Sequence, residues 1–427
     1  MKIKTPALLF ILSSLHILGV AQAQTPIIQI SGANFRPQPM ALVPSNQKEL
    51  DETLRFDLAA TGIVQLLDPK SFLSPTTEGL TADSIQFRRW SDVGAESLVK
   101  IQTVSTSSAG PAGGDVQFHL YLFNVVNQKL DFDVTVRSGP GEIRKAAHVL
   151  ADAVFKHFTH EPGPFVSHLT FVRKSGKNRE IYISDWDGKN AQLIIGQGLN
   201  LLPALGPLGG VAFTSYRTGK PSLYFQRAGG SPVSLVQGGD MATGVTYSPD
   251  GKRIAYALAS GESAQIWVAS ADGSSPKKLT DTPYFINTSP SWSPDGLRLA
   301  FVSNRAGSPQ IYTMSAEGTG AKRLTFQGEY NQTPDWSPRG DLVAFTARDE
   351  RGGFDIFTVS VETGKIVRVT QGQGHNEEPT FSPNGRQIIF ASGRNGGPHL
   401  FVSTLDGTVQ LPLPIDKGSY STPSWGR

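Results

Sequence analysis

The second half of the chain is divided into short hydrophobic runs with period-two alternation, and polar turns separate these runs. Two of them are Arg298–Ser303 (RLAFVS) and Gln310–Ser315 (QIYTMS), and similar pairs begin at Arg253, Leu342 and Gln387. Alternation over four to eight residues, with β-branched and aromatic side chains, predicts β-strands and not helices. The pattern therefore predicts an all-β region.

One short phrase precedes each of these pairs. It reads Tyr247-Ser-Pro-Asp-Gly251, Trp292-Ser-Pro-Asp-Gly296, Trp336-Ser-Pro-Arg-Gly340 and Phe381-Ser-Pro-Asn-Gly385, so its aromatic residues lie 45, 44 and 45 positions apart. Proline presets the backbone of a tight turn, and glycine accepts a positive φ at its end. A period of about 40–45 residues with four strands per unit is typical of a β-propeller blade.

Two weaker copies come before the four clear ones. The runs that begin at Gly210 and Leu169 match the second strand of the repeat, and the earlier one has no opening phrase. The missing strand stands at the other end of the chain, where Pro423-Ser-Trp425 lies 44 residues after Phe381. The sequence therefore predicts a six-bladed propeller over residues 165–427, closed by a C-terminal strand that completes the first blade and removes the open edges.

A different pattern over residues 24–161 predicts an α/β domain. A helix is expected to begin at the N-cap Ser45, with Leu50, Leu54 and Leu58 on one face, and Gly62 ends it. Residues 33–44 contain three prolines and are predicted to be an extended linker. The other expected elements are strands at 63–68 and 97–104, a short helix at 83–90, a hairpin of 115–126 with 129–137, a helix at 141–158 and a linker at 161–164.

Residues 1–23 have the features of a secretory signal peptide. Lys2 and Lys4 precede an apolar stretch, and Ala21-Gln-Ala23 offers small residues for cleavage. No later stretch reaches the roughly 20 apolar residues of a membrane-spanning helix. We therefore expect an exported protein without a membrane span. The formal net charge is +3, or +1 without the two leader lysines, so no nucleic-acid partner is expected.

The sequence offers no candidate for a catalytic, cofactor-binding or metal-binding residue. The sequence has no Gly-x-Ser-x-Gly and no His-Glu-x-x-His, and its histidines are scattered. Asp185-Trp-Asp-Gly188 with Asn190 resembles the start of a calcium loop but lacks the closing glutamate. An Asp-Gly hairpin between strands three and four of the first blade fits the repeat better.

The surface loops offer the better candidates. In such a blade, the turns after strands one and three lie on one face of the disc, and the loops after strands two and four lie on the other. The second set varies between repeats and carries residue types that are enriched at protein interfaces. These residues are Tyr284, Phe285, Tyr330, Arg305, Arg348 and Arg394.

Taken together, the leader, the α/β domain, the Gly-Pro-Phe165 junction, six blades and the terminal Pro-Ser-Trp425 resemble the TolB family, the periplasmic propeller proteins of the Tol–Pal system. The resemblance covers almost the whole chain. It implies a non-enzymatic protein that binds the lipoprotein Pal through the propeller and the C-terminal domain of TolA through the mature N-terminus. Such proteins help to keep the outer membrane intact and draw it inward at cell division.

The same resemblance implies site residues. Ile28, Ile30 and Gly32 would belong to the TolA-binding segment. The Pal surface would use residues of the loops that cross from one blade to the next: Thr288, Ser289, Gln332, Thr333, Asn376, Glu377, Glu378, Tyr420 and Thr422.

The second blade lacks the repeated phrase, so no contact is assigned near Asp240 or Met241. We expect a monomer without a cofactor, and we expect charge reversal of Glu377 and Glu378 to weaken Pal binding without unfolding the protein. Two alternatives stay open: an exported hydrolase or lyase that uses the central funnel, and a carbohydrate-binding propeller.

Overall fold

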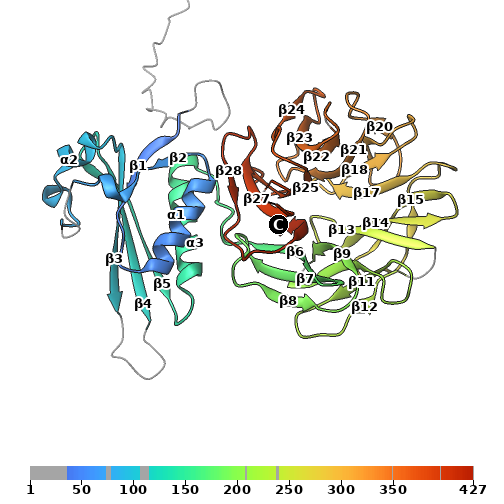
Figure 1. Cartoon of the computed structure of the whole chain (residues 1–427), viewed down its shortest axis with the longest axis horizontal. Coiled ribbons are helices and arrows are strands. Elements are labelled where there is room, and N and C mark those ends of the chain that lie inside the picture. Colours follow the sequence, from blue (N-terminus) through green and yellow to red (C-terminus); the bar gives the residue numbers. More distant parts are fainter. Residues whose placement is uncertain are drawn as a thin grey trace, which may run out of the picture.

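The computed structural model describes residues 36–73, 78–105, 115–206, 209–236, 240–348, 350–394 and 396–426. It has two parts, an N-terminal α/β domain and a disc of six four-stranded sheets (Figure 1). Among the described residues, no helix combines the length and the hydrophobicity that a membrane span requires.

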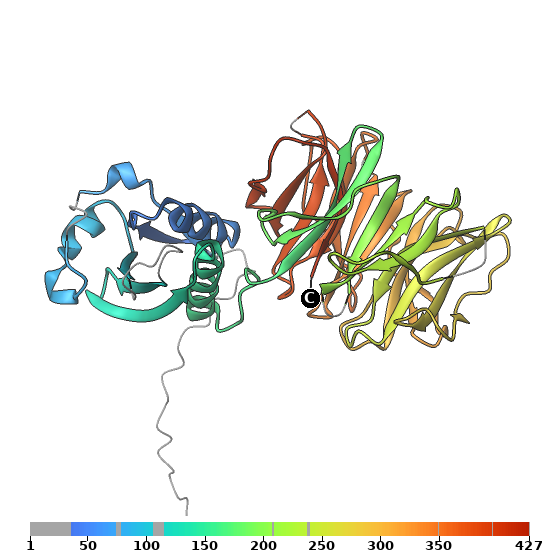
Figure 2. The ribbon, with the colours of Figure 1, turned by 90° about the horizontal axis from the view of Figure 1, so that it is seen from below.

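The N-terminal domain contains one five-stranded sheet in the order β2-β1-β3-β4-β5. Helices α1 and α3 lie between this sheet and the propeller (Figures 1 and 2). The helix α2 and the 3-10 turns η1 and η2 lie outside that layer. The bounds are β1 Gln38–Leu42, α1 Lys48–Ala60, β2 Val64–Leu66, η1 Pro69–Ser71, η2 Ala82–Ser84, α2 Phe87–Asp92, β3 Ser97–Ser105, β4 Val116–Asn124, β5 Lys129–Ser138 and α3 Ile143–Thr159.

The sheet has hydrophobic cores on both faces. Leu50, Leu54 and Leu58 of α1 are fully buried against one face, as the four-residue spacing predicts. On the other face, Phe87 and Trp90 of α2 pack with the buried residues of β1, β3 and β4. The sheet is therefore covered on both sides.

The prediction of a linker at residues 33–44 is wrong, because β1 lies inside the sheet. It pairs in parallel with both β2 and β3, and Met40 and Ala41 are fully buried. Pro39 is tolerated because the β1–β3 ladder begins one residue later, at Met40, and the carbonyl of Pro39 still accepts from the N–H of Glu96 over 2.9 Å. The number of prolines obscured the apolar run that follows Pro39.

Ser45 is not the N-cap of α1. The helix begins at Lys48, and the residue before it is Gln47, whose side chain makes no capping bond. The backbone N–H and the Oγ of Ser45 instead donate to the carboxylate of Asp51, over 2.9 and 2.7 Å. The carboxylate in the first turn thus ties down the approaching chain.

The propeller has six sheets, as predicted, and we number the blades along the chain. Blade 1 has the order β29-β6-β7-β8, and the other five each run through four consecutive strands. The bounds are β6 His168–Ser175, β7 Asn178–Asp185, β8 Gln192–Ile195, β9 Asn200–Leu205, β10 Val211–Ser215, β11 Ser222–Gln226, β12 Val233–Ser234, β13 Met241–Tyr247, β14 Arg253–Ser260, β15 Ser263–Ser270, β16 Lys277–Lys278, β17 Asn287–Trp292, β18 Arg298–Ser303, β19 Gln310–Ser315, β20 Lys322–Arg323, β21 Asn331–Trp336, β22 Leu342–Arg348, β23 Phe354–Ser360, β24 Ile366–Arg368, β25 Asn376–Phe381, β26 Gln387–Ser392, β27 His399–Thr404, β28 Gln410–Pro412 and β29 Tyr420–Trp425.

The C-terminal strand closes the ring. β29 pairs antiparallel with β6, with Trp425 opposite Leu169 and Tyr420 opposite Arg173. The predicted closure is therefore confirmed, and the first and last described parts of the propeller share one sheet. A break at this seam would expose two strand edges.

The aromatic residues of the repeated phrase are core residues between blades. Trp292 and Trp336 are 1% and 0% exposed, and the guanidinium groups of Arg253 and Arg298 lie 4.6 and 4.8 Å from their ring centroids. The serine that follows closes the turn: Ser293 Oγ accepts from the N–H of Arg298 over 2.9 Å. Each phrase thus fixes a blade to its neighbour.

The two domains share a hydrophobic core. Trp186 of the β7–β8 turn and Trp425 stack with their ring centroids 5.4 Å apart, and Trp186 also contacts Phe56 of α1 and Phe165 of the linker. At the Ser-Pro-x-Gly turns of blades 5 and 6, the linker residue Glu161 pairs with Arg386 over 2.7 Å, and with Arg339. The linker is therefore fastened to blades 5 and 6.

Candidate protein-binding face

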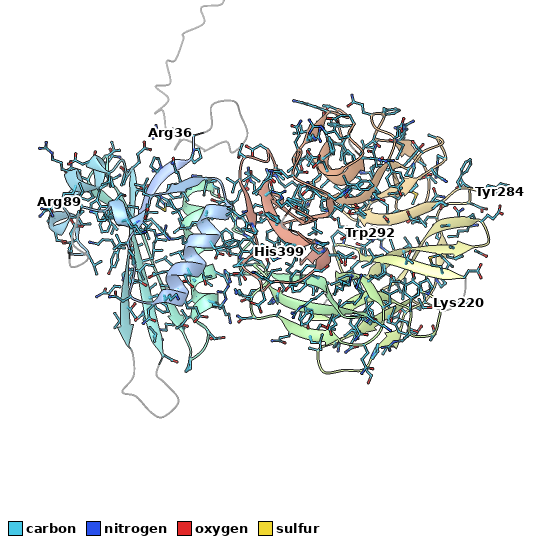
Figure 3. The ribbon with its side chains drawn as sticks, in the orientation of Figure 1. Arg36, Arg89, Lys220, Tyr284, Trp292 and His399 are labelled. Atoms are coloured by element: carbon cyan, nitrogen blue, oxygen red, sulfur yellow. The ribbon has the colours of Figure 1, made fainter. Side chains whose placement is uncertain are left out.

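The two faces of the disc differ in what they present. The loops between the second and third strands of each blade, together with the crossings from one blade to the next, form what we call the crossing-loop face. The Ser-Pro-x-Gly turns lie on the opposite face. The crossing-loop face carries the most exposed aromatic residue of the propeller, Tyr284, which is 80% exposed and lies at the edge far from the N-terminal domain (Figure 3).

Six residues with left-handed backbone surround the centre of this face, one on the innermost strand of each blade. Each innermost strand shifts its register near this point. They are Leu202, Gly244, Ser289, Thr333, Glu378 and Thr422, with φ between 45° and 66°.

This backbone is uncommon for residues other than glycine and costs about 1–2 kcal/mol at each of the five positions other than Gly244. In every blade except blade 3 the next residue is a proline, and it restricts the chain further. The ring therefore holds its side chains in a fixed arrangement.

A narrow channel runs inward from this ring. A cavity of about 160 Å³ at the crossing-loop face and one of about 260 Å³ further along share Thr246, Asp335, Thr380 and Ser424. Polar residues of the innermost strands therefore line the channel. They lie one position before the aromatic residue of each repeat.

Hydrogen bonds in the channel wall join neighbouring blades. The backbone N–H of Trp336 donates to Ser291 Oγ over 2.9 Å, and the N–H of Phe381 donates to Asp335 Oδ2 over 2.8 Å. The N–H of Trp425 donates to Thr380 Oγ1 over 3.2 Å. These polar groups therefore hold the ring together.

Glu378 is an acid in an unusual environment on the innermost strand of blade 6. Its Oε2 accepts from the N–H of Thr422 over 2.5 Å, and its own N–H donates to Thr346 Oγ1 over 3.0 Å. Burial raises the pKa of Glu378 to about 7; the bond from Thr422 opposes this rise and the charge of Glu377 adds to it. Charge reversal here would disturb the fold as well as any partner, so Glu377 alone is the better probe of binding.

The structure brings most of the expected Pal residues together. Thr288 and Ser289, Gln332 and Thr333, and Glu377 and Glu378 occupy the same two positions on β17, β21 and β25, and all six are half-buried. Thr422 takes the equivalent place on β29. Together these residues form a row around the channel mouth.

Asn376 and Tyr420 lie beneath this row. Asn376 is fully buried, where its Nδ2 donates to Asp355 Oδ1 over 2.9 Å, and Tyr420 is 3% exposed against Phe171. These two side chains therefore support the surface without lying on it. Ile28, Ile30 and Gly32 fall outside the described residues.

Two of the three arginines expected at an interface have structural roles. Arg305 and Arg394 fold back onto their own blades, where each donates to a serine and to a buried asparagine. Arg348 is exposed. Sequence reasoning missed this difference, although the spacing Ser-x-Arg in two of these repeats and Ala-x-Asp in the third would have shown it.

A second polar cluster lies between the domains. Asp57 of α1 is fully buried, accepts from Trp186 Nε1 over 3.1 Å and pairs with His148 Nδ1 over 2.7 Å. Burial raises the pKa of Asp57 to about 7, against the attraction of His148. Burial lowers the pKa of His148, but the charge and the hydrogen bond of Asp57 outweigh this, and the net change is upward.

His148, Asp185 and Asp187 have the donor types of a metal site, with ligand atoms within 4.8 Å of one another. Arg144 already supplies a cation there, through its contact with Asp187 and its Nε 3.7 Å from Asp185. The predicted hairpin at this place is confirmed, because Asp185 ends β7 and the chain turns into β8. The cluster therefore acts as a link between the domains.

Comparisons with known proteins agree with this architecture. Residues 155–427 match the TolB beta propeller domain family, and residues 26–130 match the TolB amino-terminal domain family. A Tol-Pal system protein TolB from Myxococcus xanthus (strain DK1622) is 56% identical over 292 residues, 66% of each chain. One from Anaeromyxobacter dehalogenans (strain 2CP-1 / ATCC BAA-258) is 43% identical over 284 residues, 64% of each chain.

The fold is also known from a solved structure. The crystal structure of TolB from Acinetobacter baumannii superposes with a TM-score of 0.78 at 24% sequence identity, and covers 92% of this chain and 97% of that chain. This likeness concerns the fold, and the sequence matches carry the family assignment. With both family domains matched in order, the chain belongs to the TolB family.

Proposed function

We propose that the chain is a periplasmic, non-enzymatic scaffold of the Tol–Pal system. In this proposal it binds the lipoprotein Pal on the crossing-loop face, and it binds the C-terminal domain of TolA through the segment with Ile28, Ile30 and Gly32. By linking these partners it helps to keep the outer membrane intact and to draw it inward at division. The description of its relatives from Myxococcus and Anaeromyxobacter as Tol-Pal system proteins supports membership of this system.

One observation carries the Pal part of the proposal: equivalent polar pairs from adjacent blades meet around the channel mouth. Ser289 and Thr333 line the mouth and offer hydroxyl groups, and the half-buried Gln332 and Glu377 beside it offer an amide and a carboxylate. Because the ring is rigid, a partner would meet these groups in place and would lose little entropy in ordering them. A protein surface that follows the row can form several hydrogen bonds at once.

The channel wall favours a scaffold over a hydrolase or lyase. Ser291, Asp335 and Thr380 are the groups that such an enzyme would need free, and each bonds to the neighbouring blade. An assay for cleavage of peptides and polysaccharides tests this alternative, and binding of peptidoglycan fragments tests the carbohydrate-binding one. We expect no turnover and no saturable binding in these assays.

The Pal part is tested by titration calorimetry with the soluble domain of Pal. Glu377→Lys reverses a half-buried charge beside the channel mouth, and we expect about tenfold weaker binding. The matched control is Glu362→Lys, an exposed glutamate in the β23–β24 turn on the opposite face. Its affinity should stay within about twofold of the wild type, whereas equal affinities for both variants would reject the proposed surface.

A further inference from the structure

Blades 4 and 6 each hold an arginine side chain in the same way, in a recess at the crossing-loop face that we call the arginine slot. In blade 4, Arg305 Nε donates to Ser303 Oγ over 2.9 Å and its Nη2 donates to Asn287 Oδ1 over 2.9 Å. In blade 6, Arg394 makes the same two bonds to Ser392 and Asn376, over 2.8 and 3.1 Å. The serine, the asparagine and the arginine thus form a repeated unit.

The same arginines cover aromatic rings. The guanidinium carbon of Arg305 lies 4.9 Å from the centroid of Tyr312, and that of Arg394 lies 4.3 Å from Phe401. Arg217 does the same in blade 2, at 4.9 Å from Tyr224. The three covered rings, in blades 2, 4 and 6, are only 3–7% exposed.

Blade 5 keeps part of this unit and lacks the rest. Asn331 is fully buried at the asparagine position, but Ala347 replaces the serine. The Nδ2 of Asn331 donates to Gln310 Oε1 and to the carbonyl of Gln327, over 2.8 and 2.9 Å. Within the described residues, Asn331 Oδ1 accepts no hydrogen bond. At the arginine position the sequence has Asp349, which lies outside the described residues.

A pocket of about 730 Å³ occupies this place. Asn331, Phe345, Ala347 and Phe357 line it, and the centroids of the two rings lie 5.8 Å apart. Phe357 is half-buried, whereas its counterparts in blades 2, 4 and 6 are buried. The slot that holds an arginine in those blades is therefore open in blade 5.

The charges around the pocket are mixed. Glu329 and Glu350 line it together with Arg348 and Arg368. Arg368 is held by Asp355 over 2.5 Å and by Glu350 over 3.5 Å, and its guanidinium carbon lies 5.5 Å from the centroid of Phe357. The pocket thus offers carboxylates, a ring and a buried carbonyl oxygen to a ligand.

We propose that this pocket of blade 5, beside the crossing from blade 4, is a guanidinium-binding site, which takes an arginine side chain of a protein docked on the crossing-loop face. A guanidinium group has donors for the oxygen of Asn331 and a flat surface for Phe345 and Phe357. The resident arginines of blades 4 and 6 show that this fold holds such a group with the equivalent asparagine and aromatic ring. Blades 1 and 3 offer no equivalent site, because Tyr420 and Ala242 replace the asparagine.

A small probe tests the site independently of Pal. The intact protein is titrated with N-acetyl-arginine amide, and the side-chain amide signals of Asn331 are followed by NMR. We expect a saturable shift, and at least about tenfold weaker binding of the neutral isostere N-acetyl-citrulline amide. Equal binding of the arginine and citrulline probes, or no saturable shift, would mean that water donates to the oxygen of Asn331 instead, and would overturn the proposal.

Substitutions in the chain itself can place an arginine in the pocket and so compete with the probe. Ala347→Ser with Asp349→Arg restores the Ser-x-Arg sequence of blades 4 and 6, and should abolish the response to the arginine probe. Ser260→Arg places an arginine at the same point of blade 3, where the asparagine is absent, and should leave the response unchanged. Ala347→Ser alone supplies the hydroxyl that accepts from the resident arginines of blades 4 and 6, and should strengthen binding of the arginine probe. Undiminished binding in the first variant, or no gain in binding in the third, with wild-type melting curves, would contradict the proposal.

Discussion

Glu378 of blade 6 and Thr422 of blade 1 join two neighbouring blades at the channel mouth. The N–H of Thr422, on the C-terminal strand, donates to the Glu378 carboxylate of blade 6 over 2.5 Å. This bond ties β29, the strand that completes blade 1 by pairing with β6, to the preceding blade. A titratable group therefore sits at the closure of the ring and beside the proposed Pal surface.

The first prediction concerns pH. The pKa of Glu378 is raised to about 7 in the folded state from its ordinary 4.5, so the folded protein binds more protons than the unfolded chain between these values. Its contribution to stability is greatest below pH 4.5 and is lost as the pH rises through 7. Because the side chain is half-buried, solvent limits the loss to at most about 2 kcal/mol.

Chemical unfolding of the wild type and of Glu378→Gln at pH 5 and pH 8 measures this term. Glutamine keeps a carbonyl acceptor for Thr422 but does not ionise. The variant should gain stability relative to the wild type as the pH rises. A constant difference between the two proteins at both pH values would show that Glu378 does not titrate in this range.

The second prediction concerns the repeated aromatic residue. Trp336 is fully buried among Val302, Val343 and Val359, so Trp336→Ala should lower the free energy of unfolding by about 3–5 kcal/mol. Denaturant titration measures the loss. Tyr284→Ala, at an 80% exposed position, is the control and should change stability by less than about 0.5 kcal/mol. Equal free energies of unfolding for the two variants would show that the aromatic residue is not part of the core.

The third prediction concerns the domain interface. Asp57→Ala leaves Trp186 Nε1 and His148 Nδ1 buried without their acceptor, and should cost about 2–4 kcal/mol of stability. Asp57→Asn keeps an oxygen for Trp186 and should cost less. If the alanine variant unfolds at the wild-type denaturant concentration, this cluster does not hold the domains together.

The fourth prediction concerns the N-terminal segment. Deletion of residues 24–32 should abolish binding of the TolA C-terminal domain in calorimetry, because an extended segment can add to a partner's sheet edge through its backbone. Pal binding should persist, because its proposed surface lies on the propeller. Retention of full TolA affinity by the shortened chain would place the TolA site elsewhere.

The repeat made the propeller predictable from the sequence, whereas local details depended on tertiary contacts. The phrase around Trp292 and Trp336 gave the blade count, and the displaced copy at Trp425 gave the closure. The strand with Met40 was missed because its prolines suggested a linker, yet the β1–β3 ladder begins just after Pro39. Ser45 was misassigned because Asp51 binds it from inside the helix.

The place of the candidate site in the sequence was predictable, but the burial of its side chains was not. The family resemblance implied Thr288, Gln332 and Glu377, and the structure places them at equivalent positions of β17, β21 and β25. Sequence alone did not show that Asn376 is buried, because this depends on Asp355 from the preceding blade. The same holds for Glu378, whose environment depends on Thr422 of the next blade in the ring.

Hydrogen exchange of the intact protein, with and without the soluble domain of Pal, tests the central claim most directly. Bound Pal is predicted to protect the amides of residues 327–333 and 371–378 on the crossing-loop face, and to leave the turns at 293–296 and 337–340 on the opposite face unchanged. Protection of those turns, or of the N-terminal domain alone, would contradict the account.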